Sequence, residues 1–448
     1  MGRVRRRPGP WNEVDFVAIS VLRKPIFGSW ETGMSIVRPF KALRPRKSLV
    51  DRVASPPYDV VDRAEAKAMA AGNPISFLHV AKAEIDFPDE VPPDGEQVYL
   101  KARANLRRML DAGVFRKEET PCLYIYRQQM GAHRQYGVVA AVPVEAYESG
   151  MIRKHELTLK EKEEDRTCHI DTVGAQTGLV FLTYRQDPAI DGIVGSVVGR
   201  DPEYDFRAAD EVGHTVWVIS DREEIALIRE VFRKVETLYI ADGHHRAAAA
   251  STVARRRKKR NPDHRGDEEY NFFMAAIFPH DQLKIMDYNR VVKDLNRLSV
   301  TAFLDRVEER FVVREGGEAK SPEAPHSFGM YLQGKWYLLE TREMPDPEKD
   351  IIGSLDVSIL QEQLLGPVLA IGDPRTDHRI RFVGGARGMR ELERLVDSEG
   401  HAVAFALHPT TIGELMAVAD RGRIMPPKST WFEPKLRGGI FIHCLEDF

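Results

Sequence analysis

The chain has 448 residues, of which 43% are hydrophobic and 30% charged, and its formal net charge is −3. These values are ordinary for a globular protein of two or three domains, and they argue against a general nucleic-acid binder. Three distant cysteines without a CxxC pair exclude a disulfide framework and a structural zinc site, which favours a reducing cytosol. No apolar run is long enough to span a bilayer, so we expect a cytoplasmic protein without a membrane partner.

The first 33 residues differ from the rest of the chain. They begin with a basic run and continue with a weak apolar stretch, but they contain no signal-peptide core or cleavage site. We expect residues 1–33 to be a poorly ordered start-site extension outside the fold, and Met34 to open the first strand.

Helix and strand signals follow in close succession. Asp62 is placed to cap a short helix, and Asn73-Pro74 is expected to end it before a further strand. Residues 92–115 have apolar side chains at helical spacing and stop at Gly113.

From residue 121 the pattern becomes that of a β-hairpin, with one strand over 121–130 and a second over 134–144. The next expected elements are strands over 179–184, 214–219 and 271–279 and a helix that begins after Asp221.

The second half contains a linker-like stretch, 314–327, followed by an expected hairpin over 328–340 and a strand–helix–strand–helix pattern over 381–422. Because hairpins and strand–helix units alternate irregularly, the sequence predicts an α+β (mixed α/β) fold. We expect a core over 34–300 and a C-terminal α/β domain over 328–448.

One polar cluster stands between a β-prone segment, 237–241, and the four helix-forming alanines at 247–250. Its members are Asp242, Gly243, His244, His245 and Arg246. Gly243 allows a tight turn, the first N–H groups of a helix lack intrahelical partners, and Arg246 adds a forked cation, so the turn is a candidate anion site. The alternative is a polar turn in which Asp242 caps the helix.

The basic run that follows, residues 254–265, is interpreted as a solvated helix end and loop. A phosphate or nucleic-acid patch is the less favoured interpretation of this run.

Two further polar clusters stand out. The second consists of Lys154, His155, Glu156, Thr158, Asp165, Arg166 and Thr167, and the third of Lys428, Ser429, Thr430 and Lys435 after Pro426-Pro427. The alternative for the second is a solvated charged helix, and for the third a plain loop with a helix-cap residue. The third lacks the glycine-rich loop of a P-loop.

Together these clusters contain the types of residue that a phosphoryl-transfer site uses. Helix N–H groups, an arginine and a lysine bind phosphate, and the carboxylates Glu156, Asp165 and Asp242 are candidate Mg²⁺ ligands. A remaining carboxylate or a histidine such as His155 accepts the proton of a substrate hydroxyl.

The segment "ADGHHRAAAA" resembles the strand–turn–helix signature of the ParB/sulfiredoxin-like superfamily, in which such a turn binds nucleotide phosphates. The wider pattern is similar to the family called domain of unknown function 1015. The motifs that carry it are "RPFKALRP", "SPPYDVV", "NPISFLHV", "KHELTLKEKEEDR", "ADGHHRAAAA", "LDVSILQEQLL" and "MPPKSTWFEPKL". The resemblance covers about residues 34–445 and implies a ParB/sulfiredoxin-like nucleotide-binding core.

Metabolic relatives in that superfamily are free-serine kinases, so the resemblance implies a kinase that uses ATP or ADP, with L-serine or a similar hydroxy compound as substrate. It assigns nucleotide phosphates to Gly243, His244, His245 and Arg246. From their chemistry we add Asp242, Lys428, Ser429 and Thr430 to the phosphate-binding set, and we select Glu156, Asp165 and His155 as catalytic candidates.

Two other function classes stay open. One is a non-catalytic regulator that reads ATP or CTP, and the other is a DNA-binding adaptor. Only 254–265 offers the basic surface that an adaptor needs, so we expect no nucleic-acid partner.

Overall fold

The computed structural model describes residues 35–316, 319 and 321–446. The described residues form one compact unit. The extension expected over 1–33, and Met34 itself, lie outside the described residues. Within the described part of the chain, no helix is both long and apolar enough to cross a membrane.

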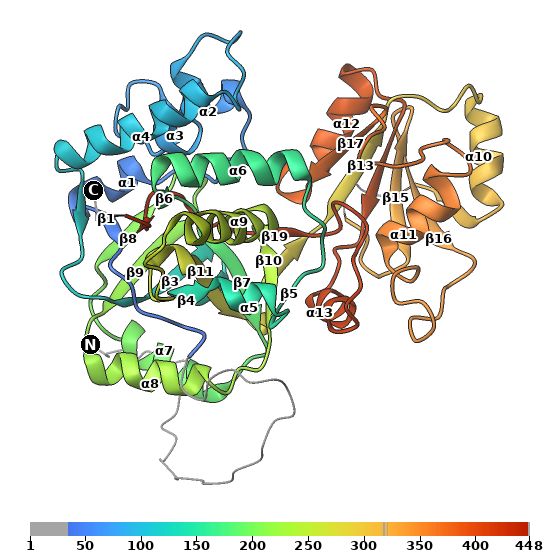
Figure 1. Cartoon of the computed structure of the whole chain (residues 1–448). Helices are drawn as coiled ribbons and strands as arrows, with labels where there is room; N and C mark the ends of the chain where they lie inside the picture. Colours follow the sequence, from blue (N-terminus) through green and yellow to red (C-terminus); the bar gives the residue numbers. More distant parts are fainter. Residues whose placement is uncertain (1–34, 317–318, 320, 447–448) are drawn as a thin grey trace, which may run out of the picture. The chain divides into compact units, whose positions relative to one another are not determined.

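In the described residues the largest sheet has eight strands (Figure 1). From edge to edge they are β5 (Ile152–Arg153), β10 (Leu238–Asp242), β7 (Val180–Tyr184), β11 (Phe272–Pro279), β4 (His133–Pro143), β3 (Leu123–Met130), β9 (Gly213–Ile219) and β8 (Tyr204–Arg207). The pairs β5–β10 and β7–β11 are parallel, and the other neighbours are antiparallel. The hairpin expected over 121–144 is confirmed as β3 and β4.

Both faces of this sheet are buried, which explains why its strands are continuous apolar runs. One face, with Leu182 and Ile277, packs in a common core with apolar residues of α7 (Pro188–Val198), α8 (Arg222–Phe232) and α9 (His244–Arg260). On the other face Phe181 contacts Phe432 from the C-terminal region, with ring centroids 5.6 Å apart.

A second sheet has six strands in the described residues, and all its pairs are antiparallel. In order they are β14 (Phe311–Glu315), β16 (Lys335–Thr341), β15 (Ser327–Leu332), β18 (Val403–Leu407), β13 (Tyr288–Val292) and β17 (Ile380–Gly384). The fold is therefore mixed α+β, as the sequence predicted. The linker-like stretch 314–327 joins β14 and β15 of this one sheet. The sheet also contains β13, which lies within the range 34–300 that was expected to form the core. The division into 34–300 and 328–448 stays a prediction.

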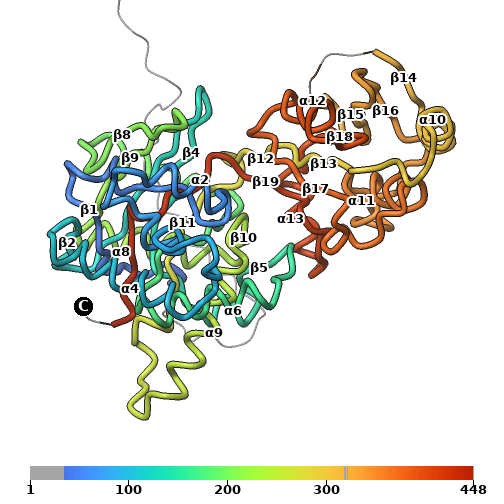
Figure 2. The backbone as a smooth tube through the Cα atoms, turned by 90° about the horizontal axis from the view of Figure 1, so that it is seen from above, coloured from blue at the N-terminus to red at the C-terminus, as the bar shows by residue number. Residues whose placement is uncertain are grey.

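Short pairings join segments that are far apart in the sequence, and several of them involve the C-terminal residues. In three short pairings, β1 (Leu43–Pro45) joins β2 (Phe115–Lys117), β12 (Lys284–Met286) joins β19 (Trp431–Glu433), and β6 (Ala175–Gln176) joins β20 (His443–Cys444). Leu43 also pairs with Ile442, and Ser55 with Gly438. In Figure 2 the red end of the tube accordingly lies among blue and green segments.

The remaining helices are α1 (Val50–Val53), α2 (Arg63–Ala70), α3 (Leu78–Ala81), α4 (Glu96–Asp111), α5 (Val144–Glu148), α6 (Lys160–Val173), α10 (Val300–Glu308), α11 (Asp356–Leu360), α12 (Met389–Ser398) and α13 (Ile412–Asp420). The expected caps are confirmed: Asp62 makes a capping box with Glu65, and the Asp221 carboxylate accepts from Glu223 and Glu224.

The strand expected after Asn73-Pro74 is wrong, because this segment contains the short helix α3. Phe77 and Val80 are buried in a cluster with residues of α4, and one helical turn places both on that side. Packing thus overrides the β-propensity of the segment.

Candidate active site

The strand-to-helix turn is present as expected: β10 ends at Asp242, and α9 begins at His244. Gly243 between them has φ of 92°, in the left-handed region that favours glycine. A Cβ there would lie 3.3 Å from Nη1 of Arg246 and 3.5 Å from Cα of Val180. The N–H groups of Arg246 and Ala247 both donate to the Gly243 carbonyl, at 2.9 and 3.1 Å, which closes the first turn of α9.

The four alanines form the packed face of α9. Ala247 to Ala250 are at most 5% exposed and belong to the core cluster of the eight-stranded sheet. The charged helix α6 lies along α9 (Figure 1) and pairs with its basic end, as in the ion pairs Arg256–Glu164 and Arg257–Asp171. Small side chains therefore let α9 approach the sheet, and the run 254–265 includes a helix end that faces carboxylates.

Arg246 is buried and held by protein groups. Its Nη2 lies 3.0 Å from both carboxylate oxygens of Asp59, and its Nη1 donates to the Leu179 carbonyl at 2.9 Å. Its guanidinium also lies 5.5 Å from the Tyr58 ring centroid, and that of Arg166 lies 3.9 Å from it. Burial alone would lower the pKa of Arg246, but Asp59 and Asp242 raise it further above its ordinary value.

Tyr58 and Asp59 are site residues that sequence reasoning missed. They belong to the "SPPYDVV" motif, but no spacing rule connects them with Arg246, which lies 187 residues further along the chain. The motif itself was the available signal.

Asp242 does not cap α9, because the helix has no side-chain cap bond. Its carboxylate accepts from the Gly243 N–H at 2.8 Å and from Nζ of Lys435 at 3.1 Å. Burial would raise the pKa of Asp242, but Lys435 and Arg246 outweigh it and hold the pKa well below its usual range. Asp242 therefore stays ionised and fixes Lys435 beside the turn.

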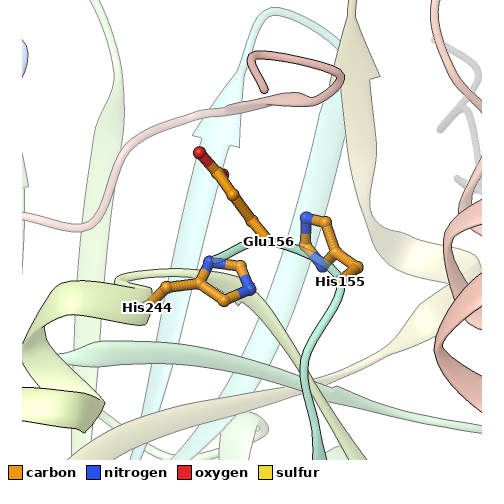
Figure 3. Close-up of side chains that lie close together, drawn as sticks. All are labelled: His155, Glu156 and His244. Atoms are coloured by element: carbon orange, nitrogen blue, oxygen red, sulfur yellow. The ribbon is translucent and has the colours of Figure 1, made fainter. Parts of the chain in front are cut away.

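His155, Glu156 and His244 lie close together (Figure 3), each offering a ligand atom within 4.8 Å of the other two. The rings of the two histidines meet edge to face, with centroids 4.5 Å apart. Burial lowers the pKa of His155 to about 4 and that of His244 well below its ordinary value, so both imidazoles are neutral near pH 7. Burial also raises the pKa of Glu156, although Lys428 acts in the opposite direction.

Besides Lys435, the third sequence cluster contributes Lys428 and Thr430 to the site. Burial would lower the pKa of Lys428, but Tyr288 and Glu156 outweigh it and raise the pKa above its ordinary value. Oγ1 of Thr430 lies 3.3 Å from Nε2 of His155. The buried hydroxyl of Ser429 instead donates to the Pro426 carbonyl at 2.6 Å, within its own loop.

The other predicted residues are placed as follows. Nε2 of His245 accepts from the Leu159 N–H at 3.0 Å, and burial lowers its pKa. Asp165 accepts from the Tyr99 hydroxyl at 2.8 Å and pairs with Arg166 at 2.7 Å. The three carboxylates predicted to bind Mg²⁺ are thus not brought into one ligand group: Asp165 is paired with Arg166, Asp242 with Lys435, and Glu156 lies with the histidines.

A cavity of about 40 Å³ lies beside Arg246 and is lined among others by Tyr58, Arg166 and His169. A space of this size holds water and not a nucleotide.

Residues 37–358 match the family described as "Protein of unknown function (DUF1015)". The chain belongs to this family. No curated protein matches it significantly.

Solved structures similar to this member of the family include a free serine kinase variant in complex with AMP, at 15% identity, 66% coverage of this chain, 87% of that chain and a TM-score of 0.33. A conserved hypothetical protein from Pyrococcus furiosus is similar at 13% identity, 66% and 90% coverage and a TM-score of 0.31. SbnI with a C-terminal truncation, from Staphylococcus aureus, follows at 12% identity, 66% and 84% coverage and a TM-score of 0.33. The role of each residue in this chain is therefore inferred from that residue's own contacts, burial and charge.

Proposed function

We propose that the chain is a small-molecule kinase that transfers a phosphoryl group from ATP or ADP to a hydroxyl. The favoured acceptor is free L-serine, which becomes O-phospho-L-serine. The observation that supports this most is the juxtaposition of the α9 N-terminus with the half-buried Lys435, which pairs with Asp242, and with Glu156, whose pKa is raised.

The phosphate end of the site is the turn at Gly243. The N-terminus of α9 carries a partial positive charge and N–H groups directed out of the helix. Lys428 and Lys435 add full charges on the same side, where Lys435 is anchored by Asp242 at 3.1 Å. These groups bind the phosphate oxygens of the donor and stabilise the charge that develops during transfer.

The acceptor end is Glu156. Because burial raises the pKa of this carboxylate, Glu156 is a better base than an exposed glutamate. The positive charge of Lys428 acts in the opposite direction and lowers this pKa in part. Glu156 takes the proton of the acceptor hydroxyl as the oxygen bonds to the terminal phosphorus. The bond from that phosphorus to the bridging oxygen breaks, and ADP leaves when ATP is the donor, or AMP when ADP is the donor.

Mg²⁺ was expected from the sequence, and it normally neutralises donor phosphates in such reactions. The protein groups do not form a ready site for it, since Asp165 and Asp242 are each paired with a cation and the group around Glu156 contains two imidazoles. Mg²⁺ prefers oxygen ligands. We therefore assign no step to a protein-held Mg²⁺.

The test is to incubate the purified chain with L-serine, Mg²⁺ and ATP or ADP, and to measure O-phosphoserine by mass spectrometry. We expect product with the native chain and with Glu161→Gln, an exposed carboxylate of α6. In Glu156→Gln we expect turnover to fall about 100-fold or more while nucleotide binding survives. No phosphorylated product with any amino-acid or hydroxy-acid acceptor would overturn the proposal, and nucleotide binding without turnover would favour the regulator.

A further inference from the structure

Three potential metal ligands meet beside the turn. His155 and Glu156 come from the segment that follows β5, and His244 is the first residue of α9 (Figure 3). One ligand atom from each lies within 4.8 Å of the others. Around a metal with bonds of about 2.0–2.1 Å, tetrahedral ligand atoms lie about 3.4 Å apart, so modest side-chain rotation would close this group on an ion.

A second, independent observation comes from the burial of His244. Its side chain is 5% exposed, yet Nε2 of the ring has no hydrogen-bond partner among the described residues. A buried polar atom without a partner costs free energy, and such atoms are rare unless a ligand or water satisfies them. A metal bond would satisfy this nitrogen.

His155, another of the three candidate ligands, contacts a residue outside the group. His155 is 2% exposed, and its Nε2 lies 3.3 Å from the Thr430 hydroxyl. Contacts of this kind fix the ring orientation of metal-binding histidines.

We propose that His155, Glu156 and His244 bind one divalent cation of the zinc class. Two imidazole nitrogens and one carboxylate oxygen suit Zn²⁺ and its first-row neighbours and do not suit Mg²⁺ or Ca²⁺. The set leaves a fourth position for water or substrate. When the ion is bound, Glu156 is a metal ligand and cannot accept a proton, so metal binding and the proposed role of Glu156 as a base exclude each other. Binding of the metal itself does not depend on the proposed kinase activity.

The test uses the metal-stripped full-length chain titrated with Co²⁺, without nucleotide. We expect about one Co²⁺ to bind with the visible absorption of a tetrahedral site, and Zn²⁺ but not excess Mg²⁺ to displace it. His244→Ala should weaken binding at least about 100-fold. His378→Ala, which removes an exposed histidine of the second half, should leave it unchanged.

Glu156→Gln keeps the side-chain volume at a partly exposed position, so it serves as a second variant if His244→Ala fails to fold. It should lower affinity and change the absorption spectrum. Absence of one-to-one Co²⁺ binding in the native chain, or binding that the folded variants leave unaltered, would overturn the proposal.

Discussion

Among the described residues, α9 and α12 each begin at a glycine with positive φ, and only one of the two turns has the surroundings of a site. Gly243 before α9 has φ of 92°, and Gly388 before α12 has φ of 73°; neither helix has a side-chain cap bond. Around Gly243 lie Arg246 and the backbone of Val180, whereas a Cβ at Gly388 would have no atom within 4 Å. A positive φ before a helix thus acquires chemistry only where distant segments bring charged groups to the turn, as Asp59 and Lys435 are brought to the turn at Gly243.

The largest expected effect concerns the buried arginine. Arg246→Ala removes a buried guanidinium that bonds the Leu179 carbonyl and the partly exposed Asp59 carboxylate, so we expect a loss of about 3 kcal/mol in the free energy of unfolding. Arg390→Ala, at an exposed residue near the start of α12, should change it by less than about 0.5 kcal/mol. Urea denaturation measures both. Equally small losses of stability in both variants would show that the Arg246–Asp59 pair has no special role. In a second background, Arg246→Met, the addition of Asp59→Asn should recover part of the lost stability.

Substitution of the two glycines sharpens the contrast. Gly243→Ala and Gly388→Ala should each cost about 1–3 kcal/mol, because both positions have positive φ. Nucleotide affinity should separate them. Gly243→Ala forces Arg246 to move and should weaken ADP binding about 10-fold or more, whereas Gly388→Ala should leave it unchanged. Calorimetry on the folded variants measures these ADP affinities. Equal affinities would show that the nucleotide phosphates do not bind at the α9 turn.

A smaller effect is expected from Glu269, beside the eight-stranded sheet. Burial would raise its pKa, but His443 and Arg38 outweigh burial and lower the pKa from 4.5 to about 2. Its contribution is therefore present above pH 4.5 and lost as the pH falls from 4.5 towards 2. Because the side chain is 40% exposed, solvent screening limits it to about 1 kcal/mol. Glu269→Gln should lower stability at pH 7 by this amount and should make no difference at pH 2.

Asp356, in the region of the six-stranded sheet, should show the opposite sign. Burial raises its pKa from 3.8 to about 6, although the nearby His326 lowers it. The folded state therefore binds the proton more tightly, and stability decreases as the pH rises from 3.8 through 6. Asp356→Asn should stabilise the chain by about 1 kcal/mol at pH 7.5 and lose this advantage near pH 3.8. Thermal denaturation at the two pH values checks the crossover.

Local signals predicted much of the fold. The β10–α9 junction followed from an apolar run, one glycine and four alanines, and the caps at Asp62 and Asp221 followed from residue type alone. Segment 73–80 failed because its helix depends on packing against α4, which no local pattern reports.

The site was harder to predict because its contacts join distant segments. Arg246 meets Asp59 across 187 residues, and His155 meets Thr430 across 275. Sequence reasoning selected His155 and Glu156 for their chemistry and assigned His244 to phosphate binding from the family resemblance, and it grouped Glu156 with Asp165 and Asp242 as metal ligands. Charge pairing explains the difference, since Arg166 and Lys435 already occupy those two carboxylates.

A crystal structure of the native chain with ADP tests directly whether the α9 turn binds the nucleotide phosphates. We expect the terminal phosphate to lie within hydrogen-bond distance of the backbone N–H groups at His244 and His245, with Lys428 or Lys435 in contact. Glu156 should face the open side of that phosphate. Phosphates bound elsewhere, with the α9 turn in contact with solvent alone, would contradict the account.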